Sequence, residues 1–121
     1  MNNKDIETKR ANQEYEKYVK IGHEINGSDV STVINKAIEQ NEKNNIPKDE
    51  KGKYIENAGN EVKIELKMVT VNKTFDMETI QKNGMANFMQ NFALINFKCL
   101  DIEYHKETGL VKKIVLEEIE E

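Results

Sequence analysis

The chain has little of what builds most catalytic and metal sites. Its 121 residues include one cysteine, Cys99, one proline, Pro47, no tryptophan and six scattered glycines. A single cysteine excludes an internal disulfide and a thiolate metal cluster within one chain. The sequence also lacks a glycine-rich phosphate loop and the motifs HExxH, CxxC and GxSxG. We therefore expect no catalytic residues, no metal and no cofactor.

Long apolar runs and an excess of positive charge are missing too. No stretch approaches the about 18 apolar residues of a membrane span, and the first residues are polar, so we expect a cytoplasmic chain with no membrane contact. The formal net charge is −4, and an acidic chain repels phosphate backbones unless its lysines gather on one face. Lysine outnumbers arginine 17 to one and asparagine occurs 15 times, a bias typical of an AT-rich genome such as that of a low-GC bacterium or its phages.

The last third of the chain predicts a β-hairpin from Asn96 to Glu121. Gly109 accepts a positive φ, so we expect a type I turn over residues 106–109. Counting outward from this turn gives six pairs: Tyr104 with Lys112, Glu103 with Lys113, Ile102 with Ile114, Leu100 with Leu116, Lys98 with Glu118, and Phe97 with Ile119. A slip of one residue would turn every side chain to the other face. The second face is half apolar, with Phe97, Cys99, Val111, Val115 and Ile119.

Two helices are predicted in the first half. Apolar residues three or four apart predict a first helix over residues 4–25, ended by Asn26-Gly27. Ser28 or Asp29 can cap a second helix. Its apolar stripe consists of Val30, Val33, Ile34, Ala37 and Ile38. Residues 41–60 are almost wholly polar and predict a connector that is partly ordered at best.

The second half predicts a β-α-β-β unit. Alternating apolar residues from Val62 to Val71 predict a strand, and Thr74 or Asp76 can cap a helix from Met77 to Leu94. The fold class is therefore α+β, with two N-terminal helices before a three-stranded, mostly antiparallel sheet that ends in the hairpin. We divide the chain into a helical front segment with its connector, 1–60, and a core, 61–121, within one compact domain.

The side chains that could form a catalytic or metal site do not come together in the predicted strands. Cys99 and His105 lie about 20 Å apart along one strand, too far for a catalytic dyad. Free cysteine is usually buried, and we expect that of Cys99. The row of Asp101, Glu103 and His105 is interpreted as a solvated face rather than a metal site.

A DNA-binding alternative requires that Gly84 divide residues 77–94 into two helices joined by a turn. The helix 85–94 would then follow a turn and the hairpin 98–118 would act as a wing, as in a winged helix. Asn87, Gln90 and Asn91 share one face and can bind adenine edges. Phosphate contacts would come from hairpin lysines, namely Lys98, Lys106, Lys112 and Lys113. Residues 85–94 contain no lysine or arginine, however, and one continuous helix with a solvated amide face is the favoured reading.

The leading hypothesis is a small, non-catalytic protein-interaction module. Tyr15 and Tyr18 lie on a charged helix, and such amphipathic side chains are favoured at protein interfaces. With them we name Asn87, Gln90 and Asn91 as partner-binding residues. The front helices either cover the sheet or bind another protein or a second copy of the chain, as in a homodimer. Size and composition favour an assembly, inhibitor or immunity protein of a phage or mobile element.

Overall fold

The computed structural model describes residues 3–56 and 58–120, so Glu121, the end of the predicted hairpin, lies outside them, as does residue 57 of the connector. The elements are α1 (Asn3–Glu16), β1 (Glu24–Asn26), α2 (Gly27–Lys43), β2 (Lys63–Met68), β3 (Lys73–Asp76), α3 (Met77–Asn83), α4 (Met85–Phe92), β4 (Asn96–Tyr104) and β5 (Val111–Glu118). The α+β class is confirmed. The sheet has five strands in the order β1-β4-β5-β2-β3, and β2 runs parallel to β5.

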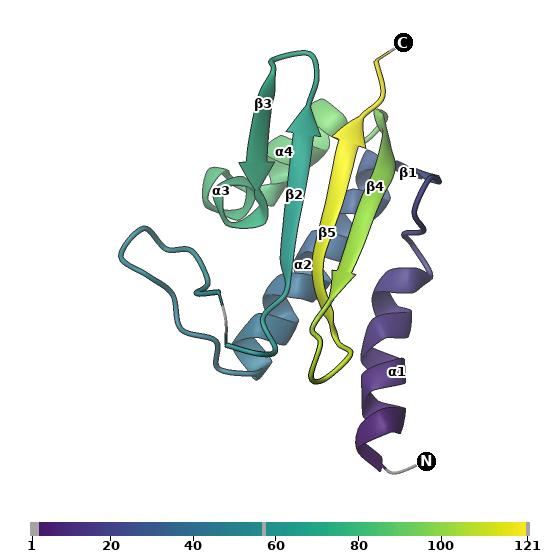
Figure 1. Cartoon of the computed structure of the whole chain (residues 1–121). Coiled ribbons are helices and arrows are strands. Elements are labelled where there is room, and N and C mark those ends of the chain that lie inside the picture. Colours follow the sequence, from purple (N-terminus) through teal and green to yellow (C-terminus); the bar gives the residue numbers. More distant parts are fainter. Residues whose placement is uncertain (1–2, 57, 121) are drawn as a thin grey trace.

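The helices and the sheet form two layers. Figure 1 shows α2 and α4 behind the sheet, α1 beside the β4–β5 turn, and β3 at the free left-hand edge. Within the described residues no helix covers the front face. The prediction of three strands is wrong because β1 and β3, with three and four residues, are too short to show an alternating pattern.

The first helix ends earlier than predicted. It stops at Glu16 rather than near residue 25, and Gly22 has a φ of 85°, which a helix does not allow. Ile25 is instead a buried residue of β1, paired with Phe97. The cap of α2 is Asn26 and neither Ser28 nor Asp29, because Asn26 Oδ1 accepts a hydrogen bond from the Asp29 backbone amide at 2.8 Å.

The second helix has the predicted buried stripe, and all five of its apolar residues are buried. The first residue of α2, Gly27, packs so closely against α4 that it has no room for a side chain. A Cβ on Gly27 would lie 1.7 Å from the carbonyl oxygen of Phe92, and the Gly27 amide donates to the carbonyl of Ile95 at 2.8 Å. The beginning of α2 and the end of α4 therefore touch backbone to backbone.

The hairpin is present, with a register that is only partly as predicted. The pairs Ile102–Ile114 and Glu103–Lys113 are confirmed. Irregularities between Cys99 and Asp101 and between Glu103 and Tyr104 shift the outer pairs, which become Cys99–Leu116, Lys98–Glu117, Phe97–Glu118 and Tyr104–Val111. An extra residue in one strand moves the following side chains to the other face. Phe97, Cys99 and Val111 are thereby buried, not left on a half-apolar second face.

The predicted helix 77–94 is two helices. Gly84, with a φ of 98°, ends α3 and precedes α4, so the continuous helix is wrong. Asp76 caps α3 as expected, accepting a hydrogen bond from the Thr79 amide at 2.8 Å.

The strand predicted to run to Val71 ends at Met68, and after a turn the chain forms β3. In the connector, Tyr54 is buried, whereas Ile55 is 37% exposed.

Candidate functional site

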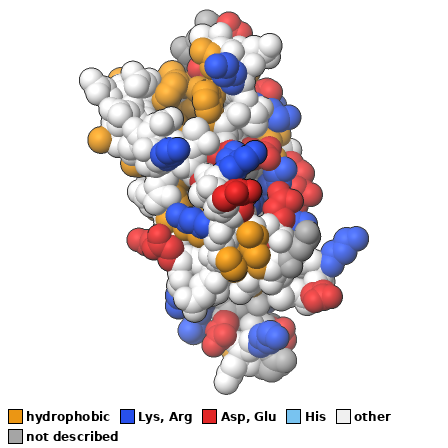
Figure 2. Space-filling view, turned by 90° about the vertical axis from the view of Figure 1, so that its left-hand side faces the viewer, with side chains coloured by type: hydrophobic (Ala, Val, Ile, Leu, Met, Phe, Trp, Pro, Cys, Tyr) orange, Lys and Arg blue, Asp and Glu red, His pale blue; other side chains and the backbone are white. Residues whose placement is uncertain are grey.

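A narrow apolar groove separates the β2–β3 edge of the sheet from α3 and α4. It encloses about 200 Å³. We call it the β3–α4 groove and define it by its lining residues: Leu66, Met68, Phe75, Thr79, Ile80, Asn83, Gly84, Asn87, Phe88, Asn91 and Phe92. Figure 2 views the molecule from this edge and shows hydrophobic side chains gathered in its upper half, with Lys or Arg side chains nearby.

Three local features build the apolar floor of the groove. In β2 the alternate residues Leu66 and Met68 point to the helical side. Phe75 pairs with Leu66 and so extends the same face to the edge strand. The break at Gly84 begins α4, whose Phe88 and Phe92 rings lie 5.2 Å apart. Aromatic side chains from a strand and from a helix thus face one opening.

Asparagines form the rim. The Asn87 Nδ2 group donates to the carbonyl of Asn83 at 2.8 Å, and Asn91 Nδ2 donates to that of Asn87 at 2.9 Å. With these nitrogens bonded to the helix backbone, the amide oxygens of Asn87 and Asn91 remain to accept hydrogen bonds from a partner. An apolar floor under a polar rim is the usual anatomy of a recognition site.

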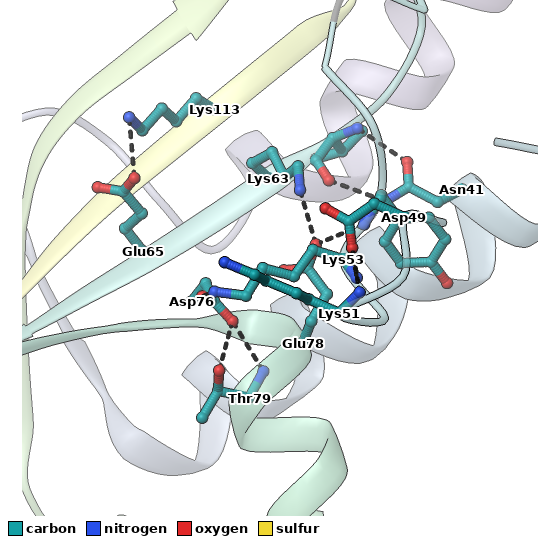
Figure 3. Close-up of polar contacts among 12 residues, drawn as sticks. Asn41, Asp49, Lys51, Lys53, Lys63, Glu65, Asp76, Glu78, Thr79 and Lys113 are labelled. Carbon is teal, nitrogen blue, oxygen red and sulfur yellow. Dashed lines mark hydrogen bonds and ion pairs between the residues drawn. The ribbon is translucent and has the colours of Figure 1, made fainter. Parts of the chain in front are cut away.

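The carboxylates beside the groove already have partners within the chain (Figure 3). Asp76 accepts from Lys53 and from Thr79. Glu78 is 5% exposed, and its Oε2 lies 2.7 Å from Lys63 Nζ and 2.9 Å from the Tyr54 amide. These bonds hold the connector and α3 against the sheet below the groove.

The same bonds fix the charge state of Asp76. Burial alone would raise the pKa of its carboxyl, but the hydrogen bonds from Lys53 and Thr79 outweigh burial and keep that pKa below its ordinary value. In turn, the hydrogen bond to Asp76 raises the pKa of Lys53. Both groups are therefore charged near neutral pH.

Lysines flank the groove without such partners. Lys73 lies two residues before Phe75 on β3 and pairs with Met68, so it shares the face of the groove. Lys82 lies in the last turn of α3, next to Asn83. Both are exposed, and neither forms an ion pair with another described residue. This edge of an acidic protein therefore offers positive charge.

A larger cleft of about 830 Å³ lies between α1, α2 and the hairpin turn. Long charged side chains make up half of its lining residues, and Lys36 Nζ lies 2.7 Å from Glu14 Oε2, which both Lys36 and Lys17 bind. Hydrogen bonds from these lysines lower the pKa of Glu14. The cleft is wide, and its cations and carboxylates alternate, so it presents no single chemistry to a ligand.

Of the residues predicted to bind a partner, two lie in the groove. Asn87 and Asn91 line it, whereas Gln90 is exposed on α4 outside the lining. Tyr15 is 1% exposed; its hydroxyl donates to Gln40 Oε1 at 2.6 Å, and burial raises its pKa above the ordinary value. Tyr18 is half-buried against the core. Tyr15 therefore attaches α1 to its own chain.

The residues named for DNA binding lie on different surfaces. Lys98 and Lys113 alternate with buried residues of the central strands and face the uncovered side of the sheet, opposite α4 and its amides. Lys106 is exposed in the hairpin turn, and Lys112 is the extra residue of a bulge. Both hairpin strands also pair on their outer sides, with β1 and with β2, so the hairpin is not a free wing.

The row interpreted as a solvated face is partly buried. His105 is 8% exposed, and its Nε2 lies 2.8 Å from the carbonyl oxygen of Glu61 and 3.6 Å from Glu61 Oε1. A bond to the backbone of Glu61, two residues before β2, therefore holds the imidazole. Cys99 is buried as predicted, and burial raises the pKa of its thiol. No group of three or more His, Cys, Asp or Glu side chains in residues 3–56 and 58–120 has the geometry of a metal site.

Comparison with known proteins gives no relative from which a function could be transferred. No family model, no curated protein and no solved structure matches the chain. None of the described helices is long and apolar enough to cross a membrane. The β3–α4 groove is thus the candidate site on the strength of its own chemistry.

Proposed function

We propose that the chain is a non-catalytic protein-interaction module whose partner docks in the β3–α4 groove. The observation that carries this proposal is an apolar floor, with Phe75, Phe88 and Phe92, open at an edge of the molecule under an asparagine rim. Grooves of this composition gain free energy by removing apolar surface from water and orient the partner through the rim.

The size of the groove favours a protein partner over a small molecule. Pockets for small molecules typically enclose roughly 300–1,000 Å³, whereas this groove encloses about 200 Å³. That volume suits an anchor side chain whose remaining contacts lie on the surface around it. We place the chain among assembly, inhibitor or immunity proteins of phages or mobile elements, the group that its size and composition favour.

Selection from a display library of random peptides tests the proposal. The bait is the whole chain, used as wild type, as Asn87→Trp and as Gln90→Trp. Asn87 and Gln90 are both exposed on α4, and only Asn87 lines the groove. An indole at position 87 covers the opening, and one at position 90 does not. We expect peptides that the wild type and Gln90→Trp retain and Asn87→Trp does not. Equal retention by the three baits, or none, contradicts the proposal.

A gel shift with random duplex DNA in low salt addresses the winged-helix alternative. Because the amides of α4 and the lysines Lys98 and Lys113 face opposite sides of the sheet, we expect no salt-sensitive complex. A complex lost on Asn87→Ala and on Lys106→Ala would overturn our proposal in favour of DNA binding.

A further inference from the structure

We propose that the occupant of the groove is an extended segment of a partner protein, with an apolar residue and an acidic residue two positions apart, that pairs with the free edge of β3. This inference rests on the proposed function and specifies its ligand. Three features of the edge carry it: unpaired backbone groups, the direction of the β3 side chains, and the sign of the charge beside the groove.

The first feature is the backbone of β3. Among the described residues it is the last strand of the sheet and pairs only with β2, so along its outer side the backbone amides and carbonyls have no strand to bond. Four residues at about 3.3 Å each give an edge of about 13 Å. An edge of this length accepts a short added strand, which is one of the recurring modes of peptide recognition.

The second feature is the alternation of side chains. Phe75 and Lys73 point to the helical side, toward the groove, whereas Thr74 and Asp76 point to the uncovered face. A strand added beside β3 continues this alternation, so every second side chain of the partner enters the groove beside Phe75. The side chains between them lie over the uncovered face. The partner residue beside Phe75 is therefore apolar, and the partner residue beside Lys73 lies two positions away on the same face.

The third feature is charge. Asp76 and Glu78 are neutralised by Lys53 and Lys63. Lys73 and Lys82 are left as the exposed charges at the groove, and carboxylates of a partner complement them. A second copy of the chain would instead bring its own Lys73 to the same edge. Like charges and the net charge of −4 on each copy oppose that arrangement.

A helical partner is disfavoured by the same geometry. A helix satisfies its own backbone and leaves the outer groups of β3 without partners. A helix binds through anchor side chains at positions i, i+3, i+4 and i+7, which fill a larger groove than one of about 200 Å³. The extended form uses both the edge and the groove.

Sequencing the peptides retained by the wild type and rejected by Asn87→Trp tests the inference. We expect a consensus with an apolar residue and an Asp or Glu two positions apart. We expect Lys73→Glu to weaken binding of these peptides about tenfold, because attraction becomes repulsion. The matched control, Lys20→Glu, changes an exposed lysine in the loop after α1 and leaves binding unchanged.

A structural readout on the whole chain locates the bound segment. With one retained peptide added to ¹⁵N-labelled protein, we expect the largest amide shifts at Lys73–Asp76 and in α4, and contacts between the peptide backbone and β3. Groove ligands that are basic, helical or insensitive to Lys73→Glu would overturn this inference and leave the proposed function standing. The absence of any groove-dependent ligand would overturn both.

Discussion

Two lysine–glutamate pairs of the same chemistry lie in different surroundings. In one, the side chains of Lys63 and Glu78 are 16% and 4% exposed; in the other, those of Lys113 and Glu65 are 32% and 33% exposed. Water stabilises a charge that loses its partner near the surface and cannot do so in the interior. We therefore expect a lysine-to-methionine substitution to lower the free energy of unfolding by different amounts in the two pairs.

Lys63→Met should lower the free energy of unfolding by about 3 kcal/mol, because it leaves the buried Glu78 carboxylate without its cation. Lys113→Met, the matched control, should cost less than about 1 kcal/mol. Urea unfolding at neutral pH measures both. Equal losses for the two variants would refute the assignment of Lys63–Glu78 as the buried structural pair.

A second residue-scale prediction concerns two glycines. Gly27→Ala places a methyl group on the Phe92 carbonyl and should cost about 3 kcal/mol, since neither backbone can yield. The methyl group of Gly52→Ala would lie in open space, so we expect only the strain of its φ of +80° to destabilise the fold, by about 1 kcal/mol. Thermal unfolding of the two variants provides the comparison. A milder effect at Gly27 than at Gly52 would mean that α2 and α4 do not touch there.

At the scale of elements, the connection between β3 and α3 depends on pH. Since the folded pKa of Asp76 lies below its unfolded value of about 3.9, ionised Asp76 stabilises the fold above about pH 4. That contribution is lost as the pH falls through the folded pKa.

Asp76→Asn keeps a side chain that can cap α3 and removes the charge that binds Lys53. We expect a loss of about 1 kcal/mol at pH 7, shrinking as the pH falls below about 4 and reaching zero once the pH is below the lowered folded pKa, where the wild-type carboxyl is protonated as well. Denaturant unfolding at both pH values measures this. A difference that stays constant with pH would show that the charge of Asp76 contributes nothing.

The elements of this fold differ in how well the sequence predicts them. The stripe of α2 and the central hairpin pairs follow from periodicity, because a regular element repeats its signal over many residues. The shifts beside Leu100 and Lys112 do not, since an extra residue in a strand leaves no local mark and is decided by the burial of Phe97, Cys99 and Val111. The end of α1 was missed for a similar reason. Ile25 continues a helical spacing but pairs with β4.

The candidate site was predictable only in part. Helical spacing named Asn87 and Asn91, which line the groove. The facing wall was missed, because Phe75 lies in a four-residue strand that the alternation from Val62 does not reveal. Tyr15 carried an interface signal, yet it is buried by its own chain. Interior and interface aromatic residues have the same spacing on a helix, and only the neighbouring elements distinguish them.

At the scale of the whole molecule, helices cover one face of the sheet, and the β3–α4 groove opens at the edge where the sheet ends. Its apolar floor, basic flank and unpaired strand occur together at that edge. The central claim is that a partner protein binds there.

The most direct test is the affinity of one selected peptide, measured by fluorescence anisotropy, for the wild type, Asn87→Trp and Gln90→Trp. Both substitutions are at exposed helical positions and should change stability by less than about 0.5 kcal/mol. We predict that Asn87→Trp weakens binding at least about tenfold, whereas Gln90→Trp stays within about twofold of the wild type. Equal affinity for all three, with each variant folded, would contradict the claim.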